Sequence, residues 1–125
     1  MTQTRFFTIE EANRTLPLVR RIVADILKAG QDIRVVSLEI ENPEEDPRII
    51  ALMDELDALF EEIESLGCSY KDWNFQMGLV DFPCVIQGQE ACLCWRSDEP
   101  EILYYHDEES GYAGRRPLPA QGGKL

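Results

Sequence analysis

The chain has 125 residues, of which 24 are acidic and 12 basic, so its formal net charge at pH 7 is −12. This balance argues against partners such as nucleic acids and anionic membrane surfaces, which select basic proteins. Hydrophobic residues make up 44% and charged residues 29%, as in globular proteins. We therefore expect one cytoplasmic domain over residues 1–125, because no stretch could span a membrane and no signal peptide begins the chain.

A long amphipathic helix is predicted at the start of the chain. Thr8 and Glu11 have the spacing of a capping box, which marks a helix N-terminus. Apolar residues then recur at steps of three and four, with Gly30 in one of the apolar positions, and the helix should end near Glu39. Pro17 lies inside this helix and predicts a kink, because proline donates no backbone hydrogen bond.

A second helix should follow a short acidic turn. Asp46 and Pro47 suit an N-cap and a first helical residue, so residues 8–67 are predicted to form an antiparallel helical hairpin. Both helices also have apolar residues beside their main apolar stripes. These extra residues are Ile22, Leu27, Ile50, Met53 and Phe60. A small sheet cannot cover all of them, so we expect a homodimer or higher oligomer formed through the helices.

Residues 73–118 are predicted to form a small antiparallel sheet with its loops. Runs rich in β-branched, aromatic and cysteine residues at 80–86, 91–96 and 102–106 indicate three strands, and the alternation at 73–76 permits a fourth. The overall prediction is an α+β fold, with a long helical hairpin packed on a sheet of three or four strands. Residues 119–125 are rich in glycine and polar residues, and we expect a disordered tail there.

Turn positions predict the register of these strands. A two-residue turn at Gly88 and Gln89 would place Asp81 opposite Arg96, and the loop after residue 96 would place Arg96 opposite Glu101. This ion-pair row could simply stabilise the sheet, or it could orient Arg96 toward a small anionic ligand. The opposite face would be the core face, with Phe82, Cys84, Ile86, Leu93, Trp95, Ile102 and Tyr104.

The same register argues against thiol chemistry. It turns His106 away from Cys92 and Cys94, so no catalytic Cys–His pair is expected. No zinc site is expected either, because Cys68 and Cys84 do not form a second ligand pair and Cys84 lies on the opposite face. Acidic residues around His106 offer an alternative metal site: Asp98, Glu99, Glu101, Asp107, Glu108 and Glu109. We expect reduced cysteines, no cofactor and no metal.

The loop at 111–116 is a second candidate for an anion. Gly111 and Gly114 precede Arg115, and backbone N–H groups in such a loop could cradle an anion together with the guanidinium. An ordinary turn is the alternative.

Five residues form the predicted ligand-binding set: Asp81, Arg96, Glu101, His106 and Arg115. They predict a binding or protein-interaction domain that recognises its partner with the polar face of the sheet. The alternative is a small metal-dependent, hydrolase-like enzyme in which Asp81, Glu101 and His106 act on an anionic substrate.

A string of short motifs also resembles a known family. FTIEEANRTLPLVR, GLVDFP, LCWR, EPEI, YYHD and GYAGRRPL resemble, in order and spacing, the bacterial family catalogued as domain of unknown function 2203. The resemblance spans residues 7–118 and implies no established activity. It puts emphasis on Gly78, Asp81, Phe82, Pro83, Trp95, Arg96, Glu99, Glu101, His106, Gly111, Gly114 and Arg115. Tyr105 is a departure, because family members often have Trp before the His.

Overall fold

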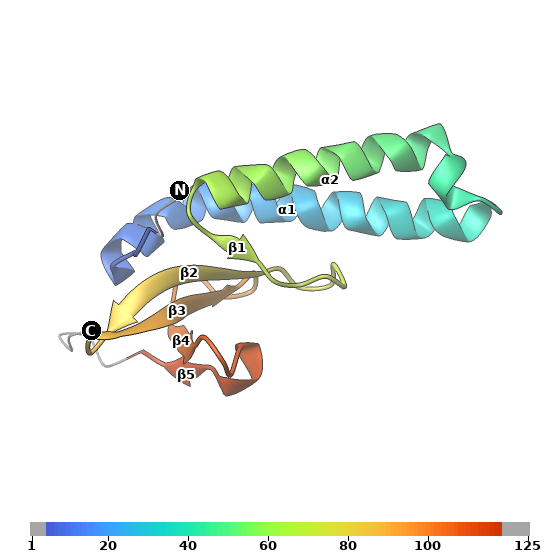
Figure 1. Cartoon of the computed structure of the whole chain (residues 1–125). Coiled ribbons are helices and arrows are strands. Elements are labelled where there is room, and N and C mark those ends of the chain that lie inside the picture. The colour runs from blue at the N-terminus through green and yellow to red at the C-terminus, as the bar shows by residue number, and fades with distance from the viewer. Residues whose placement is uncertain (1–4, 119–125) are drawn as a thin grey trace.

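The computed structural model describes residues 5–118 and shows an α+β fold (Figure 1). Two long helices lie along one side of an antiparallel sheet, whose five strands follow one another in the order β1-β2-β3-β4-β5. The predicted fold class is confirmed, with one more strand than the largest number expected. The tail predicted at 119–125 lies outside the described residues.

The hairpin consists of α1 (Ile9–Glu39) and α2 (Pro47–Ser65), joined through the short 3-10 helix η1 (Pro43–Glu45). Thr8 and Glu11 form the predicted capping box, each side chain accepting a hydrogen bond from the other residue's backbone N–H. Asp46 caps α2 by accepting from the N–H of Arg48 at 2.8 Å. Helix α1 runs through Pro17 and ends at Glu39 as predicted.

The sheet is a meander of β1 (Ser69–Tyr70), β2 (Leu79–Ile86), β3 (Gln89–Arg96), β4 (Tyr104–Asp107) and β5 (Arg116–Pro117). A short helix, η2 (Tyr112–Gly114), precedes β5. No strand forms at 73–76, so that prediction was wrong. Instead, the side chain of Asp72 accepts hydrogen bonds from the N–H groups of Asn74, Gln76 and Met77 and folds the segment into a turn.

The core lies between α1 and the adjacent face of the sheet. The side chains of Phe82, Leu93 and Trp95 are fully buried there, in one cluster with residues of both helices. Every predicted core-face residue is buried except Tyr104, which is replaced on that face by Tyr105. Removing a buried ring such as that of Trp95 would cost roughly 3–5 kcal/mol.

The β2–β3 register differs from the prediction by two residues. The turn is at Gln87 and Gly88, which both have positive φ angles of 52° and 80°, as a type I′ turn requires. Asp81 therefore faces Cys94 instead of Arg96. Because side chains alternate with a period of two, a shift by two leaves each residue on its predicted face.

The β3–β4 register differs by one residue, and this reverses β4. His106 faces Cys92, and Tyr105 faces Leu93, so His106 lies on the polar face together with Cys92 and Cys94. The cause is the loop before β4, where the N–H of Ile102 donates to Asn13 Oδ1 of α1 at 2.9 Å. Ile102 is buried but outside the strand, which begins only at Tyr104.

Within residues 5–118, neither helix combines the length and the apolarity that crossing a bilayer demands.

Candidate functional site

A hollow of about 440 Å³ opens on the polar face of the sheet. We call it the polar pocket. Strands β2, β3 and β4 form its floor, and the segment that leads into η2 forms one wall. Its lining residues are Lys71, Leu79, Asp81, Cys92, Cys94, His106, Glu108, Gly111 and Tyr112.

Three polar side chains meet at the floor of the polar pocket. The carboxylate of Asp81, the thiol of Cys94 and the imidazole of His106 each place one ligand-type atom within 4.8 Å of the other two. All three residues are buried, with 8%, 1% and 3% of their surface exposed. Adjacent strands bring them together, since Cys94 faces Asp81 across β2–β3 and lies two residues from the partner of His106 on β3.

The hydrogen bonds of His106 fix the roles of its two ring nitrogens. Nδ1 lies 2.7 Å from the carbonyl oxygen of Asp107, and a carbonyl can only accept, so Nδ1 carries a hydrogen. Nε2 lies 3.0 Å from Oδ1 of Asp81. With Nδ1 already protonated, a neutral ring would point the Nε2 lone pair at a carboxylate oxygen. Nε2 therefore faces the carboxylate of Asp81 across a short gap that either a hydrogen or a metal ion can bridge.

The two neighbouring cysteines are poor nucleophiles in this setting. Burial, with a contribution from the charge of Asp81, raises the pKa of Cys92 and of Cys94 to about 12. A reactive thiol needs a lowered pKa. Our reason for excluding a Cys–His pair was wrong, because His106 does share a face with both thiols, but a thiolate nucleophile is still disfavoured unless a metal ion replaces the proton.

Arg96 does not lie between Asp81 and Glu101, so the predicted ion-pair row was wrong. Its Nε donates to Asp98 Oδ1 at 2.6 Å, and its Nη1 donates to the hydroxyl of Tyr112 at 2.6 Å. The bond to Asp98 raises the pKa of Arg96 and lowers that of the Asp98 carboxyl. The Arg96 side chain is 31% exposed, and together with Tyr112 it lines a smaller hollow beside the polar pocket.

Arg115 is held in a buried ion pair. Its Nη2 donates to Glu99 Oε1 at 2.7 Å and to the carbonyl of Cys94 at 3.1 Å. Its guanidinium also stacks on the ring of Tyr104 at 4.0 Å. The same oxygen of Glu99 accepts from the N–H of Arg96 at 2.8 Å. Arg115 therefore fastens the segment before β5 to β3 and has little freedom to contact a ligand.

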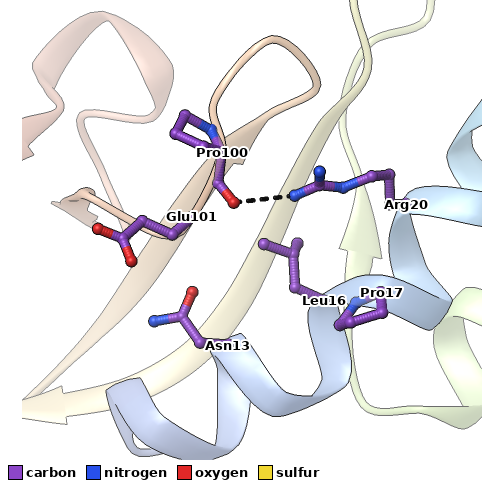
Figure 2. A pocket seen from close by; sticks show the side chains of 6 residues that line it. All are labelled: Asn13, Leu16, Pro17, Arg20, Pro100 and Glu101. Atoms are coloured by element: carbon purple, nitrogen blue, oxygen red, sulfur yellow. Dashed lines mark hydrogen bonds between the residues drawn. The ribbon is translucent and has the colours of Figure 1, made fainter.

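Glu101 lies in a different hollow, shown in Figure 2. This hollow has about 530 Å³ and lies between α1 and the loop before β4. Arg20 crosses it to donate to the carbonyl of Pro100 at 3.0 Å. The structure thus brings Asp81 and His106 together, places Arg96 and Arg115 near them, and leaves Glu101 apart from all four.

Sequence reasoning missed three residues of this site. Cys94 was excluded from thiol and zinc chemistry, Glu99 was placed in an acidic cluster around His106, and Tyr112 was left within the loop at 111–116. The signal for Cys94 was present in the LCWR motif, but only the correct β3–β4 register places it beside His106.

The fold and the polar pocket define a class: a small α+β protein with a ligand-sized polar hollow on the outer face of its sheet. Residues 5–118 match the model of the family described as "Uncharacterized conserved protein (DUF2203)", and the chain belongs to this family. Searches of curated proteins and of solved structures returned no match.

Proposed function

We propose that the protein is a binding domain whose polar pocket takes a small ligand with an anionic group. The observation that carries this proposal is the meeting of Asp81, Cys94 and His106 at the floor of an open hollow. Polar groups this buried are costly unless they are satisfied. Convergent polar side chains in a concave site are typical of ligand binding.

Cationic groups at the rim favour an anionic ligand. Lys71 lines the pocket and is exposed to solvent. Arg96 lines the neighbouring hollow and donates to the hydroxyl of Tyr112, which both hollows share. Lys71 and Arg96 thus flank a pocket whose other charged lining residues, Asp81 and Glu108, are acidic. In a protein with a net charge of −12, such local positive charge would guide the orientation of the ligand more than long-range attraction would.

A binding screen tests this function. The purified protein is titrated with monocarboxylates, dicarboxylates and phosphate esters, and binding is followed by backbone NMR shifts. We expect shifts confined to β2, β3, β4 and η2, and roughly 10- to 150-fold weaker binding in Lys71→Gln, since a hydrogen bond to a charged group contributes about 1.5–3 kcal/mol. Arg21→Gln is the matched control, because it removes one exposed positive charge from α1 outside the pocket lining. Equal affinities of the two variants, or no shifts with any compound, would contradict the proposal.

The second part of the proposal is self-association through the helices. Of the extra apolar residues, Ile22, Leu27 and Phe60 pack into or against the core, whereas Ile50 and Met53 remain 48% and 53% exposed. They belong to the part of the hairpin near η1, which extends beyond the sheet (Figure 1). The last turns of α1 add Val35 and Leu38, which are 56% and 84% exposed.

These four side chains support a second copy of the chain as the occupant of this surface, because a homodimer would cover the same patch on both copies. Light scattering over a concentration series should report a dimer or larger species, and Leu38→Glu should shift it toward the monomer. Val85→Glu is the matched control, since Val85 is exposed on the sheet. A monomer at every concentration tested would remove this part of the proposal.

A further inference from the structure

We propose that Asp81, Cys94 and His106 bind a zinc ion, with an open coordination position that faces the polar pocket. This reverses our expectation that no metal is bound, which judged zinc from the spacing of the cysteines alone, since the predicted register turned His106 away from Cys92 and Cys94. The corrected register puts a carboxylate, a thiol and an imidazole on one face within 4.8 Å of one another. Placing the open position toward an anionic ligand rests on the proposed function, whereas the metal site itself rests on the geometry.

The first argument is the orientation of His106. A histidine that binds a metal usually donates its other ring N–H to a carbonyl or carboxylate, which fixes the tautomer. Here Nδ1 donates to the carbonyl of Asp107 at 2.7 Å, and Nε2 faces Asp81. The lone pair of Nε2 is therefore directed at the point where Asp81 and Cys94 also place their ligand atoms.

The second argument is the spacing of the ligand atoms. Zinc bonds of about 2.0–2.3 Å at tetrahedral angles separate ligand atoms by roughly 3.3–3.7 Å. His106 Nε2 lies 3.0 Å from Asp81 Oδ1, and all three ligand atoms lie within 4.8 Å of one another. Small side-chain rotations can bring these distances to the separation that zinc requires. All three residues are on strands that pair with one another, so the backbone holds them in place.

The third argument is the identity of the ligands. Nitrogen, sulfur and oxygen ligands together suit a borderline-soft ion such as zinc, whereas calcium and magnesium take oxygen ligands. Zinc sites with three protein ligands keep a fourth position for water or substrate, whereas structural sites usually have four. Because all three side chains line the polar pocket, the fourth position would open into it.

Two other groups that line the same pocket are not assigned as ligands. Cys92 and Glu108 also line it, but neither belongs to the close group formed by the three ligands. On binding, the thiol hydrogen of Cys94 and any hydrogen between His106 Nε2 and Asp81 would leave as protons to solvent, and the thiolate, the ring nitrogen and the carboxylate would each form a bond to zinc. No electron transfer is required.

Titration of the EDTA-treated, reduced protein with cobalt and zinc ions tests the site. Cobalt should bind one per chain and produce a thiolate-to-cobalt absorption band in the near ultraviolet, and zinc should remove that band. Calcium and magnesium should leave the cobalt band unchanged. His106→Gln and Asp81→Asn should weaken metal binding at least about 100-fold. Replacing a residue that only hydrogen-bonds to a metal ligand typically weakens it tenfold to 100-fold. Cys94→Ser should abolish the band.

Two cysteine variants serve as controls. Cys68→Ala removes another buried thiol, outside the pocket lining, and should leave the band and the affinity unchanged. Cys92→Ser tests the neighbouring thiol: the band should persist in this variant, and its loss would overturn the assignment of Cys94 as the thiolate ligand. A band that survives in Cys94→Ser would overturn the assignment.

The unmodified protein gives a result that does not depend on the folding of the variants. If cobalt produces no band, and neither cobalt nor zinc raises Tm at millimolar concentration, the zinc proposal is wrong. The two proposals fail separately: zinc binding without any anion binding contradicts the proposed function alone, and anion binding to a protein that takes no metal contradicts the zinc site alone.

Discussion

Replacing Glu99 with alanine would test whether a buried ion pair holds the wall of the polar pocket. The carboxylate of Glu99 is 7% exposed and the side chain of Arg115 12%. One oxygen of Glu99 accepts both from Arg115 Nη2 at 2.7 Å and from the N–H of Arg96 at 2.8 Å. The alanine variant leaves a buried guanidinium and a backbone N–H without their acceptor.

The expected loss of stability follows from these contacts. Breaking a buried ion pair by removing one partner costs about 3–5 kcal/mol. This range includes the cost of leaving the N–H of Arg96 without its acceptor. For a domain of this size, 1 kcal/mol shifts Tm by about 4 °C, so we expect a fall of roughly 12–20 °C. Since domains have about 5–15 kcal/mol of stability, the variant should still fold at low temperature.

Urea unfolding provides the measurement. Trp95 is fully buried, and its Nε1 donates to the carbonyl of Glu99, so its fluorescence reports directly on this region. Glu101→Ala is the matched control, because it removes the same charge two residues away from an exposed position. Pairing Glu99→Leu with Arg115→Met should recover part of the loss, since two apolar residues leave no buried charge.

A small effect would refute the reasoning. If Glu99→Ala unfolds within about 1 kcal/mol of Glu101→Ala, the pair would be no stronger than an exposed one, and Arg115 would be free to contact a ligand as originally predicted.

Two further predictions concern the core. Gly30→Ala should destabilise the protein by about 1–3 kcal/mol, because a Cβ there would lie 2.8 Å from Cβ of Phe75 and closer to its ring. In a Phe75→Gly background, which removes that Cβ and the ring, the same change should stabilise α1 by about 0.5–1 kcal/mol. Equal effects in both backgrounds by chemical denaturation would exclude this close packing. Burial raises the pKa of Cys68 and Cys94 to about 12 and that of Cys84 to about 11, so a disulfide reagent at pH 8 with EDTA should label these thiols far more slowly in the folded than in the unfolded protein. Above about pH 8.5 the thiols of the unfolded chain lose their protons whereas those of the folded chain keep them, so the free energy of unfolding should fall as pH rises beyond that point. Rapid labelling of the folded protein, or a free energy of unfolding that is constant up to pH 10, would show that the thiols are accessible.

The helical hairpin could be predicted because its signals are local. Thr8 with Glu11, and Asp46 with Pro47, define helix starts within a few residues of sequence, and the structure confirms both caps. The sequence also showed that Gly30 occupies a position of the apolar stripe, but it did not show why a glycine is needed there. Phe75, from a segment 45 residues away, places its ring where a side chain at position 30 would lie.

The sheet was predictable in its faces but not in its register. The β2–β3 turn was placed one residue late, yet a shift of two in pairing leaves the alternation intact. Assigning Phe82, Leu93 and Trp95 to the core therefore survived the error. By contrast, the pairing of Asp81 with Arg96 depended on the register itself and failed with it.

The candidate site depends on the one pairing that local sequence could not determine. The loop between β3 and β4 is anchored by Asn13, which lies 89 residues away from Ile102 along the chain, and this contact sets where β4 begins. A slip of one residue would exchange His106 and Tyr105 between the two faces, which would bury an imidazole against the apolar core and expose an aromatic ring in the polar pocket. The fold resists that slip because Tyr105 packs against the core and His106 bonds to Asp81. Helix α1 thus contributes to the site from a distance: through the contact of Asn13 with the loop before β4, it helps to place His106 beside Asp81 and Cys94, which already face each other across β2–β3.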